Sequence, residues 1–328
     1  MMKRFFVLLI AAMMVLVMAG CTAKEEETTT TTIKIGSLQL VEHVALDEAT
    51  RGFKDVIAES GMDITIDEAN AQGEVSNCET ISAKFVNDGV DLIFANATPA
   101  AQAAAAKTSD IPIIFVSVTD AESAGLVESN ENPGGNVSGA SDLTPVAEQI
   151  DMMFELLDST EIKTVGLFYC NGEDNSIFQI DLAKKALEAK GIAYKEFTVA
   201  DVASVQSVVT SAIGQIDVAY IPTDNLLASA MPTVSEILHG AGIPIIVAEE
   251  GMCLNGGLAT YGLSYYNLGR LAGEMAIEVL NGADISSMPV RYLAAEDLEM
   301  IVNETALEQL GISVNQKLLD SARKVTSE

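Results

Sequence analysis

Apolar runs of strand length alternate with segments of helical periodicity along most of the chain. The run at residues 92–95 is followed by Thr98 and Pro99, a pair typical of a helix start, and then by the alanine-rich stretch 100–106. The strand segments are apolar with little interruption, which is expected for strands that are covered on both faces of a parallel sheet. The pattern therefore predicts an α/β protein built from repeated β-α units.

The other elements follow from the same periodicities and from glycine or proline at the segment ends. We predict strands at residues 33–38, 62–69, 92–95, 111–118, 137–141, 164–169, 193–199, 218–221, 243–248, 257–264 and 289–293. We predict helices at residues 42–60, 74–88, 99–106, 146–157, 177–190, 202–214, 225–240 and 267–280, and two short segments follow at 300–302 and 305–310.

The β-α alternation restarts after residue 145, so the chain is predicted to form two similar halves. A length of 328 residues agrees with about two domains of ~150 residues each. We expect the chain to cross between the halves at 142–145, near Ser264 and near Ala294, which makes a hinge of three strands with parallel sheets on both sides. The predicted first lobe is 33–142 plus 265–293, and the predicted second lobe is 143–264 plus 294–328.

The N-terminus has the features of a targeting segment. Lys3 and Arg4 precede an apolar stretch at 5–17 that is too short to span a bilayer comfortably, and the following Met-Ala-Gly-Cys matches a bacterial lipobox ending at Cys21. We expect residues 1–20 to be a lipoprotein signal peptide and Cys21 to be lipidated. An uncleaved anchor and an ordinary signal peptide are the alternatives. The threonine-rich, acidic residues that follow are predicted to be a disordered tether, 21–32.

Charge and cysteine content limit the possible partners and cofactors. The formal net charge is −29, which argues against a nucleic-acid partner and against broad contact with anionic lipid. Apart from the lipobox cysteine, Cys78, Cys170 and Cys253 remain, and their spacing fits no zinc motif. We expect them to be small core residues, and we predict neither a metal nor a cofactor.

The strand ends of both halves carry short polar residues. In an open α/β sheet these ends face the ligand crevice, so they are the candidate binding residues. The N-terminus of the helix at Thr98 suits a carboxylate, and Asp120, Glu173 or Asp224 suits an ammonium, a combination that fits an amino acid zwitterion. Ordinary helix caps and turn residues are the alternative explanation. The strand ends deliver Gln39, Glu42, Asn70, Gln72, Thr98, Thr119, Asp120, 171–176, Thr223, Asp224, Asn225, Glu249 and Glu250.

The sequence carries no recognisable catalytic motif. It has no nucleophile elbow, no phosphate loop and no His-Glu-x-x-His pair. Of its two histidines, His239 is placed for helix capping, whereas His43 lies near the crevice without an evident serine or cysteine partner. We predict that the protein is not an enzyme, and a hydrolase that uses acidic residues alone is the alternative.

Several longer strings are informative together. They are LQLVEHVALDEATRGF (38–53), NAQGEVSNCETISAKFV (70–86), DLIFANATPAAQAAA (91–105), PIIFVSVTDAESAGLV (112–127), PGGNVSGASD (133–142), EDNSIFQ (173–179), PTDN (222–225) and TYGLSYYNLG (260–269). These strings resemble the ABC-transporter substrate-binding lipoproteins of the tryptophan/tyrosine-binding type, over about residues 33–312. The resemblance implies two Rossmann-like lobes of the type I periplasmic-binding-protein fold, which close on a ligand and deliver it to a membrane permease and its ATPase.

The resemblance also guides the choice of site residues. Tyr265 and Tyr266 lie near the second crossing and are candidates for stacking on an aromatic ring, with core packing as the alternative. Matching motifs place Thr98 and Gln102 in ATPAAQ, Thr119 and Asp120 in VTD, Asn175 and Ser176 in EDNS, and Asp224 in PTDN. The complete predicted ligand-binding set is Gln39, Thr98, Gln102, Thr119, Asp120, Glu173, Asn175, Ser176, Thr223, Asp224, Asn225 and Tyr265.

The sequence thus predicts a lipid-anchored solute-binding protein on the extracytoplasmic face of the cell membrane. The resemblance implies that its cargo is an aromatic amino acid: tryptophan, tyrosine or phenylalanine. A binding protein for a nucleoside or a branched-chain amino acid is one alternative, because related lobes serve those solutes. A surface receptor or adhesin without a transporter is the other.

Overall fold

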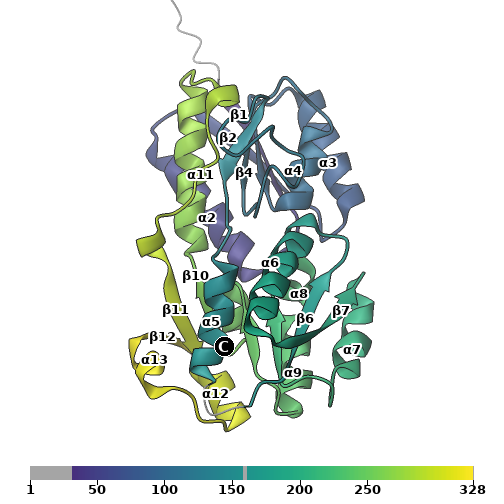
Figure 1. Cartoon of the computed structure of the whole chain (residues 1–328). Coiled ribbons are helices and arrows are strands. Elements are labelled where there is room, and N and C mark those ends of the chain that lie inside the picture. The colour runs from purple at the N-terminus through teal and green to yellow at the C-terminus, as the bar shows by residue number, and fades with distance from the viewer. Residues whose placement is uncertain (1–31, 158–160, 328) are drawn as a thin grey trace, which may run out of the picture. The chain divides into compact units, whose positions relative to one another are not determined.

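Figure 1 shows two sheets, each flanked by helices. The computed structural model describes residues 32–157 and 161–327, so the predicted signal peptide, Cys21 and nearly all of the predicted tether lie outside the described residues. The remainder of the chain, Ile33–Glu328, forms one compact unit. No helix in the described part of the chain combines the length and the apolar character needed to cross a membrane.

The first sheet has five strands in the order β2-β1-β3-β4-β5, and all neighbouring strands are parallel. Four helices pack with it, and we call this assembly lobe 1. Its strands are β1 (Ile33–Gln39), β2 (Ile64–Asn70), β3 (Leu92–Asn96), β4 (Ile113–Val116) and β5 (Val137–Ala140). Its helices are α2 (Val44–Glu59), α3 (Val75–Asp88), α4 (Thr98–Ala105) and α11 (Tyr265–Leu280).

The second sheet has seven strands in the order β12-β11-β10-β9-β8-β6-β7, and only the β10–β11 pair is antiparallel. With its helices it forms lobe 2. Its strands are β6 (Thr164–Cys170), β7 (Ala193–Val199), β8 (Val218–Ile221), β9 (Ile245–Val247), β10 (Ala259–Gly262), β11 (Glu299–Asn303) and β12 (Arg323–Val325). Its helices are α5 (Val146–Leu156), α6 (Asp174–Lys190), α7 (Val202–Ser211), α8 (Asn225–Ser229), α9 (Met231–Gly240), α10 (Glu250–Leu254), α12 (Glu304–Leu310) and α13 (Gln316–Ser321).

The prediction of two α/β lobes with mostly parallel sheets is confirmed. The chain passes from one lobe to the other three times: between β5 and α5, between β10 and α11, and between α11 and β11. The strand predicted at 289–293 is wrong, because Arg291 forms only an isolated bridge with Ala140. The segment between α11 and β11 instead contains two short 3-10 turns, Ile285–Ser287 and Ala295–Asp297.

Several helix boundaries differ from the prediction for local reasons. The helix predicted at 225–240 is divided at Ala230, because Pro232 cannot donate a backbone hydrogen bond and favours the first turn of a new helix. Helix α6 begins at Asp174, inside the segment predicted as a loop. Helices α10 and α13 and strand β12 were not predicted, because each is only three to six residues long.

Helices α2 and α11 lie side by side although about 200 residues separate them in the sequence (Figure 1). Two glycines permit this contact. A Cβ atom at Gly269 would lie 1.9 Å from the carbonyl oxygen of Ala49, and one at Gly52 would lie 2.1 Å from the carbonyl oxygen of Tyr266. Phe53 of α2 stacks on Phe94 of β3 with ring centroids 3.8 Å apart. The close approach of the two backbones therefore holds α11, the last helix of lobe 1, against α2, its first helix.

Replacing Gly269 by valine is expected to lower the free energy of unfolding by about 1–3 kcal/mol or more, because the branched side chain forces the two helices apart. Urea unfolding followed by circular dichroism measures the change. Gly240→Ala is the matched control, since a Cβ atom at Gly240 meets no atom within 4 Å. Equal stability of the Gly269 variant and the unmodified protein would contradict the packing argument.

The three cysteines of the described chain lie in the cores. Cys170 and Cys253 belong to the core on one face of the lobe 2 sheet, and Cys78 belongs to a core of lobe 1. All three are free thiols and all are buried. The prediction that they are core residues is therefore confirmed.

Candidate functional site

A small, partly enclosed cavity lies between the two lobes. It lies beyond the carboxyl ends of strands β4, β8 and β9, where open parallel sheets bind ligands. Both lobes and the links between them contribute to it. The lining residues are His43, Leu46, Ser117, Asp142, Asn175, Thr223, Asp224, Asn225, Ala228, Glu249, Met252 and Tyr265.

Hydrogen bonds join the lobes around this cavity. The Thr119 hydroxyl of lobe 1 lies 3.3 Å from the Thr223 hydroxyl of lobe 2. The amide of Gln179 in α6 donates to the same Thr119 hydroxyl at 3.3 Å, and His43 Nε2 lies 3.4 Å from Asn225 Oδ1. These contacts join lobe 1 and lobe 2 around the cavity.

Asp142 lies in the first link between the lobes and is only 3% exposed. Its Oδ1 accepts a hydrogen bond from the Thr119 hydroxyl at 3.0 Å, and its Oδ2 accepts one from the Tyr265 hydroxyl at 2.8 Å. Burial raises the pKa of the Asp142 carboxyl above its ordinary value, although both hydroxyls oppose the shift. Each carboxylate oxygen retains room for a further donor.

Asp224 and Glu173 hold the N-terminus of α8. Asp224 accepts hydrogen bonds from the backbone N–H of Cys170 and of Leu227 and from the Ser176 hydroxyl. Glu173 accepts from the backbone N–H groups of Asn225 and Leu226. Burial, together with the negative charge of Glu173, raises the pKa of Asp224 to about 7. The first free N–H groups of α8 are thus bonded to side chains of the protein itself.

Glu249 has the same relation to α10. Its carboxylate accepts hydrogen bonds from the backbone N–H groups of Gly251 and Met252 and caps the helix. The side chain is 2% exposed, and burial raises the pKa of Glu249 to about 7. The negative charges of Glu250 and Asp142 add to this shift.

Three polar atoms of the lining have no hydrogen-bond partner among the described residues. They are His43 Nδ1, Ser117 Oγ and Asn175 Oδ1. Burial lowers the pKa of His43 to about 4, so its imidazole is neutral at physiological pH. Ser117 has a φ of 56°, a left-handed conformation that is uncommon for a residue with a side chain. Unpartnered buried polar atoms are costly, and here they point to a ligand that supplies their partners.

The lining combines negative charge with an apolar wall. It includes three carboxylates and no lysine or arginine among the residues that the structure describes there. A neighbouring hollow that shares Tyr265 contains two arginines, but Arg51 is paired with Glu48 and Arg323 with Glu250 and Glu299. The apolar side chains of the cavity are Leu46, Ala228 and Met252, with the Tyr265 ring beside them.

The predicted binding residues fall into three groups. The structure brings five of them into the cavity wall: Asn175, Thr223, Asp224, Asn225 and Tyr265. Three others are hydrogen-bonded to the wall: Thr119, Glu173 and Ser176. The remaining four, Gln39, Thr98, Gln102 and Asp120, do not line the cavity.

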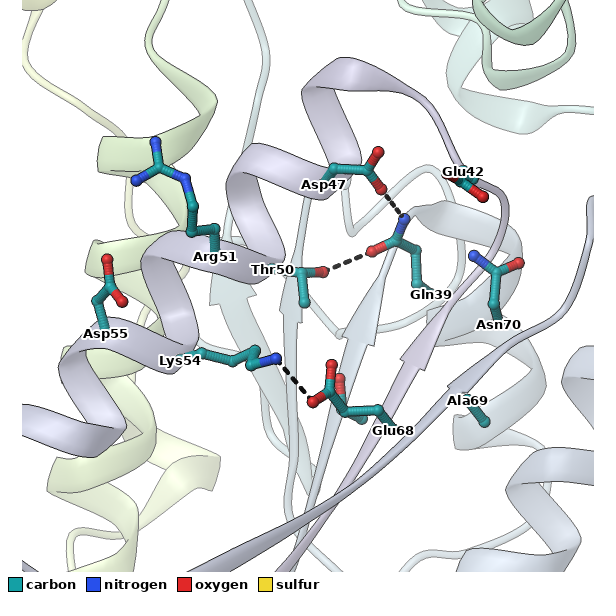
Figure 2. A pocket seen from close by; sticks show the side chains of 11 residues that line it. Gln39, Glu42, Asp47, Thr50, Arg51, Lys54, Asp55, Glu68, Ala69 and Asn70 are labelled. Atoms are coloured by element: carbon teal, nitrogen blue, oxygen red, sulfur yellow. Dashed lines mark hydrogen bonds and ion pairs between the residues drawn. The ribbon is translucent and has the colours of Figure 1, made fainter.

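Gln39 lies in a separate hollow of lobe 1, which Figure 2 shows between α2 and the ends of β1 and β2. Its amide nitrogen donates to Asp47 at 2.6 Å, and its amide oxygen accepts from the Thr50 hydroxyl at 2.6 Å. An ion pair between Lys54 and Glu68 crosses the same hollow at 2.7 Å. The polar atoms of Gln39 are therefore bonded within lobe 1.

Two of the other three residues, Asp120 and Gln102, have structural partners. Asp120 accepts hydrogen bonds from the backbone N–H of Ser123 at 2.7 Å and from Asn130 at 2.8 Å. Gln102 donates to Asp174 of lobe 2 at 2.8 Å, so it links the lobes outside the cavity. Thr98 is 1% exposed, and its hydroxyl has no partner among the described residues.

Seven lining residues are absent from the predicted binding set: His43, Leu46, Ser117, Asp142, Ala228, Glu249 and Met252. His43 and Glu249 follow strand ends, so the strand-end criterion indicates their location. Asp142 lies in the predicted first crossing, a position from which a side chain can reach both lobes. The apolar members carry no sequence signal, because only the folded helices α2, α8 and α10 bring them together.

The described residues contain no group of three histidine, cysteine, aspartate or glutamate side chains placed to hold a metal ion. The carboxylates of the cavity are instead bonded to hydroxyls and backbone N–H groups. This arrangement suits the binding of an organic ligand with hydrogen-bonding and apolar parts.

Comparison with known proteins places these features in context. A family model described as ABC transporter substrate binding protein matches residues 34–326. The chain is 41% identical over 299 residues to a protein of Clostridioides difficile strain R20291 named tyrosine-binding protein, covering 90% of this chain and 85% of that protein.

Two solved structures are similar over 90% of this chain and 100% of theirs. An ABC domain from Streptococcus pneumonia in complex with L-Trp is 34% identical, with a TM-score of 0.85. A ligand-free, open substrate-binding protein with adhesive properties from Clostridium difficile is 40% identical, with a TM-score of 0.68.

Proposed function

The chain belongs to the family of ABC transporter substrate-binding proteins, and we propose that it binds an aromatic amino acid in the cavity between its lobes. Proteins of this family act outside the cytoplasm, and they bind solutes rather than convert them. Its two α/β lobes match the type I periplasmic-binding-protein fold. Within that fold, the choice of ligand depends on the cavity.

The observation that carries the proposal is the composition of the cavity wall. It offers three carboxylates, three unpartnered polar atoms and an apolar surface with one tyrosine ring. A zwitterionic ligand with an aromatic side chain matches each part of this wall: its ammonium pairs with a carboxylate, its polar atoms bond to the unpartnered polar atoms, and its ring packs on the apolar surface. The relatives named for tyrosine and solved with L-Trp support the same class of ligand.

We further propose that binding and lobe closure are coupled. The lining residues come from both lobes, so a ligand in the cavity contacts both at once and favours the arrangement in which they meet. The TM-score of 0.85 with the L-Trp complex exceeds the value of 0.68 with the ligand-free, open protein, although the latter is more similar in sequence. This difference supports a closed arrangement of the lobes.

The wider role follows from the family and from the N-terminal sequence. We propose that Cys21 carries the lipid anchor, and that the protein delivers its amino acid to an ABC permease and its ATPase at the outer face of the membrane. A role as a surface receptor is the second candidate, because the relative from Clostridium difficile is described as having adhesive properties.

Isothermal titration tests the proposed ligand. The fragment from Thr32 onward, unfolded and refolded to remove bound ligand, is expected to bind tryptophan, tyrosine or phenylalanine with a Kd of about 1 μM or tighter. Leucine, an apolar amino acid without a ring, and a nucleoside, an aromatic compound that is not an amino acid, serve as controls. Binding of the nucleoside alone would retain the fold and overturn the proposed ligand. No binding across the panel would favour the receptor role.

A further inference from the structure

We propose that the interlobe cavity recognises the ammonium group of its ligand as the required group and the carboxylate as a secondary one. Primary aromatic amines that lack a carboxylate are then also ligands, whereas aromatic acids that lack the ammonium are not. This inference rests on the proposed binding of aromatic amino acids. It extends the ligand class to amines without a carboxylate, and it states that the ammonium is the group on which binding depends.

The first observation is the charge of the wall. Asp142, Asp224 and Glu249 are each at most 3% exposed, and Glu173 lies directly behind Asp224 and Asn225. No described lysine or arginine lines the cavity, and the one imidazole there is neutral. A buried carboxylate is stable only with a countercharge, a proton or several hydrogen bonds. A ligand cation supplies the countercharge that the wall lacks.

The second observation concerns the helix N-termini of lobe 2. Such N-termini are common binding sites for carboxylates and phosphates, because free N–H groups and the helix dipole point outward. Here the protein's own carboxylates occupy them. Asp224 and Glu173 accept from the first N–H groups of α8, and Glu249 accepts from those of α10. A ligand carboxylate therefore meets negative charge, not free N–H groups, on this side of the cavity.

The third observation identifies the receiving carboxylate. A carboxylate has about four acceptor positions. Glu173 already accepts from several N–H groups, and Asp224 accepts from three donors. Asp142 accepts from only two hydroxyls and Glu249 from only two backbone N–H groups, one on each oxygen in both cases, so these two carboxylates have the most room for an ammonium. Asp142 is the one that lies in the link between the lobes, where a ligand held by both lobes reaches it. The hydroxyls of Thr119 and Tyr265 fix its orientation.

The carboxylate of an amino acid has only neutral partners in lobe 1. Ser117 Oγ has no partner among the described residues, and α2 has no side-chain cap at its N-cap residue His43. Neutral donors contribute less than a buried ion pair, and losing them leaves no unpaired charge behind. Losing the ammonium leaves Asp142 buried without a countercharge. The two losses are therefore expected to differ greatly in their effect on affinity.

Tryptophan, tryptamine and indole-3-propionate test the proposal with the full chain purified in detergent and freed of ligand by dialysis. The chain contains no tryptophan, so changes in indole fluorescence report the ligand alone. We expect tryptamine to bind at least about 100-fold more tightly than indole-3-propionate. Its Kd is expected to lie within about 100-fold of the Kd of tryptophan. A ratio of at least tenfold between the amine and the acid supports the inference.

The remaining outcomes separate this inference from the proposed function. An amine-to-acid ratio below tenfold, or tighter binding of the acid, overturns the inference even if tryptophan binds well. Binding of tryptamine without binding of tryptophan, tyrosine or phenylalanine supports the inference and overturns the proposed function. No binding of any of the three indoles, with tyrosine and phenylalanine also inactive, overturns both.

Discussion

Replacing Asp142 by asparagine is expected to weaken the binding of an aromatic amino acid by about 100- to 4,000-fold. Removing one partner of a buried charged pair costs about 3–5 kcal/mol, and each 1.4 kcal/mol corresponds to a tenfold change in affinity. The asparagine oxygen still accepts one of the two hydroxyls that hold Asp142, so the local geometry is retained in part. Isothermal titration with the preferred amino acid measures the loss.

The same substitution is not expected to lower stability. Burial raises the pKa of Asp142, which means that the folded state disfavours the charge there when no ligand is bound. A neutral amide of the same size avoids this cost. We therefore expect the thermal midpoint of Asp142→Asn without ligand to equal or exceed that of the unmodified protein. A large loss of affinity with no loss of stability distinguishes a ligand contact from a structural one.

Asp120→Asn is the matched control. Asp120 also follows a strand of lobe 1, but its carboxylate is bonded to Ser123 and Asn130 and does not line the cavity. We expect its substitution to change the affinity less than threefold, within the usual effect of a surface change. If the two variants lose affinity equally, or if only Asp120→Asn does, the ammonium is received elsewhere and the role assigned to Asp142 is wrong.

The sequence predicted the lobes well because their elements are encoded locally. Uninterrupted apolar strands, helix-start signals such as Thr98-Pro99, and glycines at helix ends each act within a few neighbouring residues. The short elements α10 and β12 lack such signals. Gly251 is a poor helix former, and α10 is capped by the buried Glu249. Strand β12 exists only because β11 is there to pair with it.

The candidate site was predictable to a smaller extent. Strand ends indicate where a crevice lies, and they placed Thr223, Asp224 and Asn225 in its wall. They do not distinguish a residue that faces the crevice from one whose polar atoms are bonded within its own lobe, as for Gln39 and Asp120. That distinction depends on hydrogen bonds between distant segments, which a single sequence does not show. Asp142 was not predicted to line the crevice for the same reason, since Tyr265 and Thr119 orient it.

Affinity for the amino acid is expected to fall about 100-fold between pH 8 and pH 5. Burial raises the pKa of Glu249 and of Asp224 to about 7, so one or both gain a proton in this range when no ligand is bound. An ammonium favours the ionised carboxylate, so binding at acid pH must expel a proton. For one such group with a pKa near 7, affinity falls about tenfold per pH unit below 7.

The other groups that face Glu249 do not reverse this trend. His43 has its pKa lowered to about 4 and stays neutral from pH 5 to pH 8. Burial raises the pKa of Tyr265 well above its ordinary value, so the phenol stays neutral as well. Asp142 has a raised pKa and acts in the same direction as Glu249. The change of affinity with pH is therefore caused by the carboxylates. Isothermal titration in buffers of different ionisation enthalpy should show that ligand binding at pH 6 releases a proton.

Stability without ligand should show the opposite dependence. Between the unfolded pKa near 4 and the folded pKa near 7, the folded state binds more protons, so these groups make unfolding easier as the pH rises from 5 to 8. Ligand binding removes this effect, because the ammonium stabilises the charged form. Glu249→Gln removes one titrating carboxyl. Both the affinity and the stability are therefore expected to change less with pH, by about the contribution of one proton. Affinity that is constant or higher at pH 5 would contradict recognition of the ligand by these buried carboxylates.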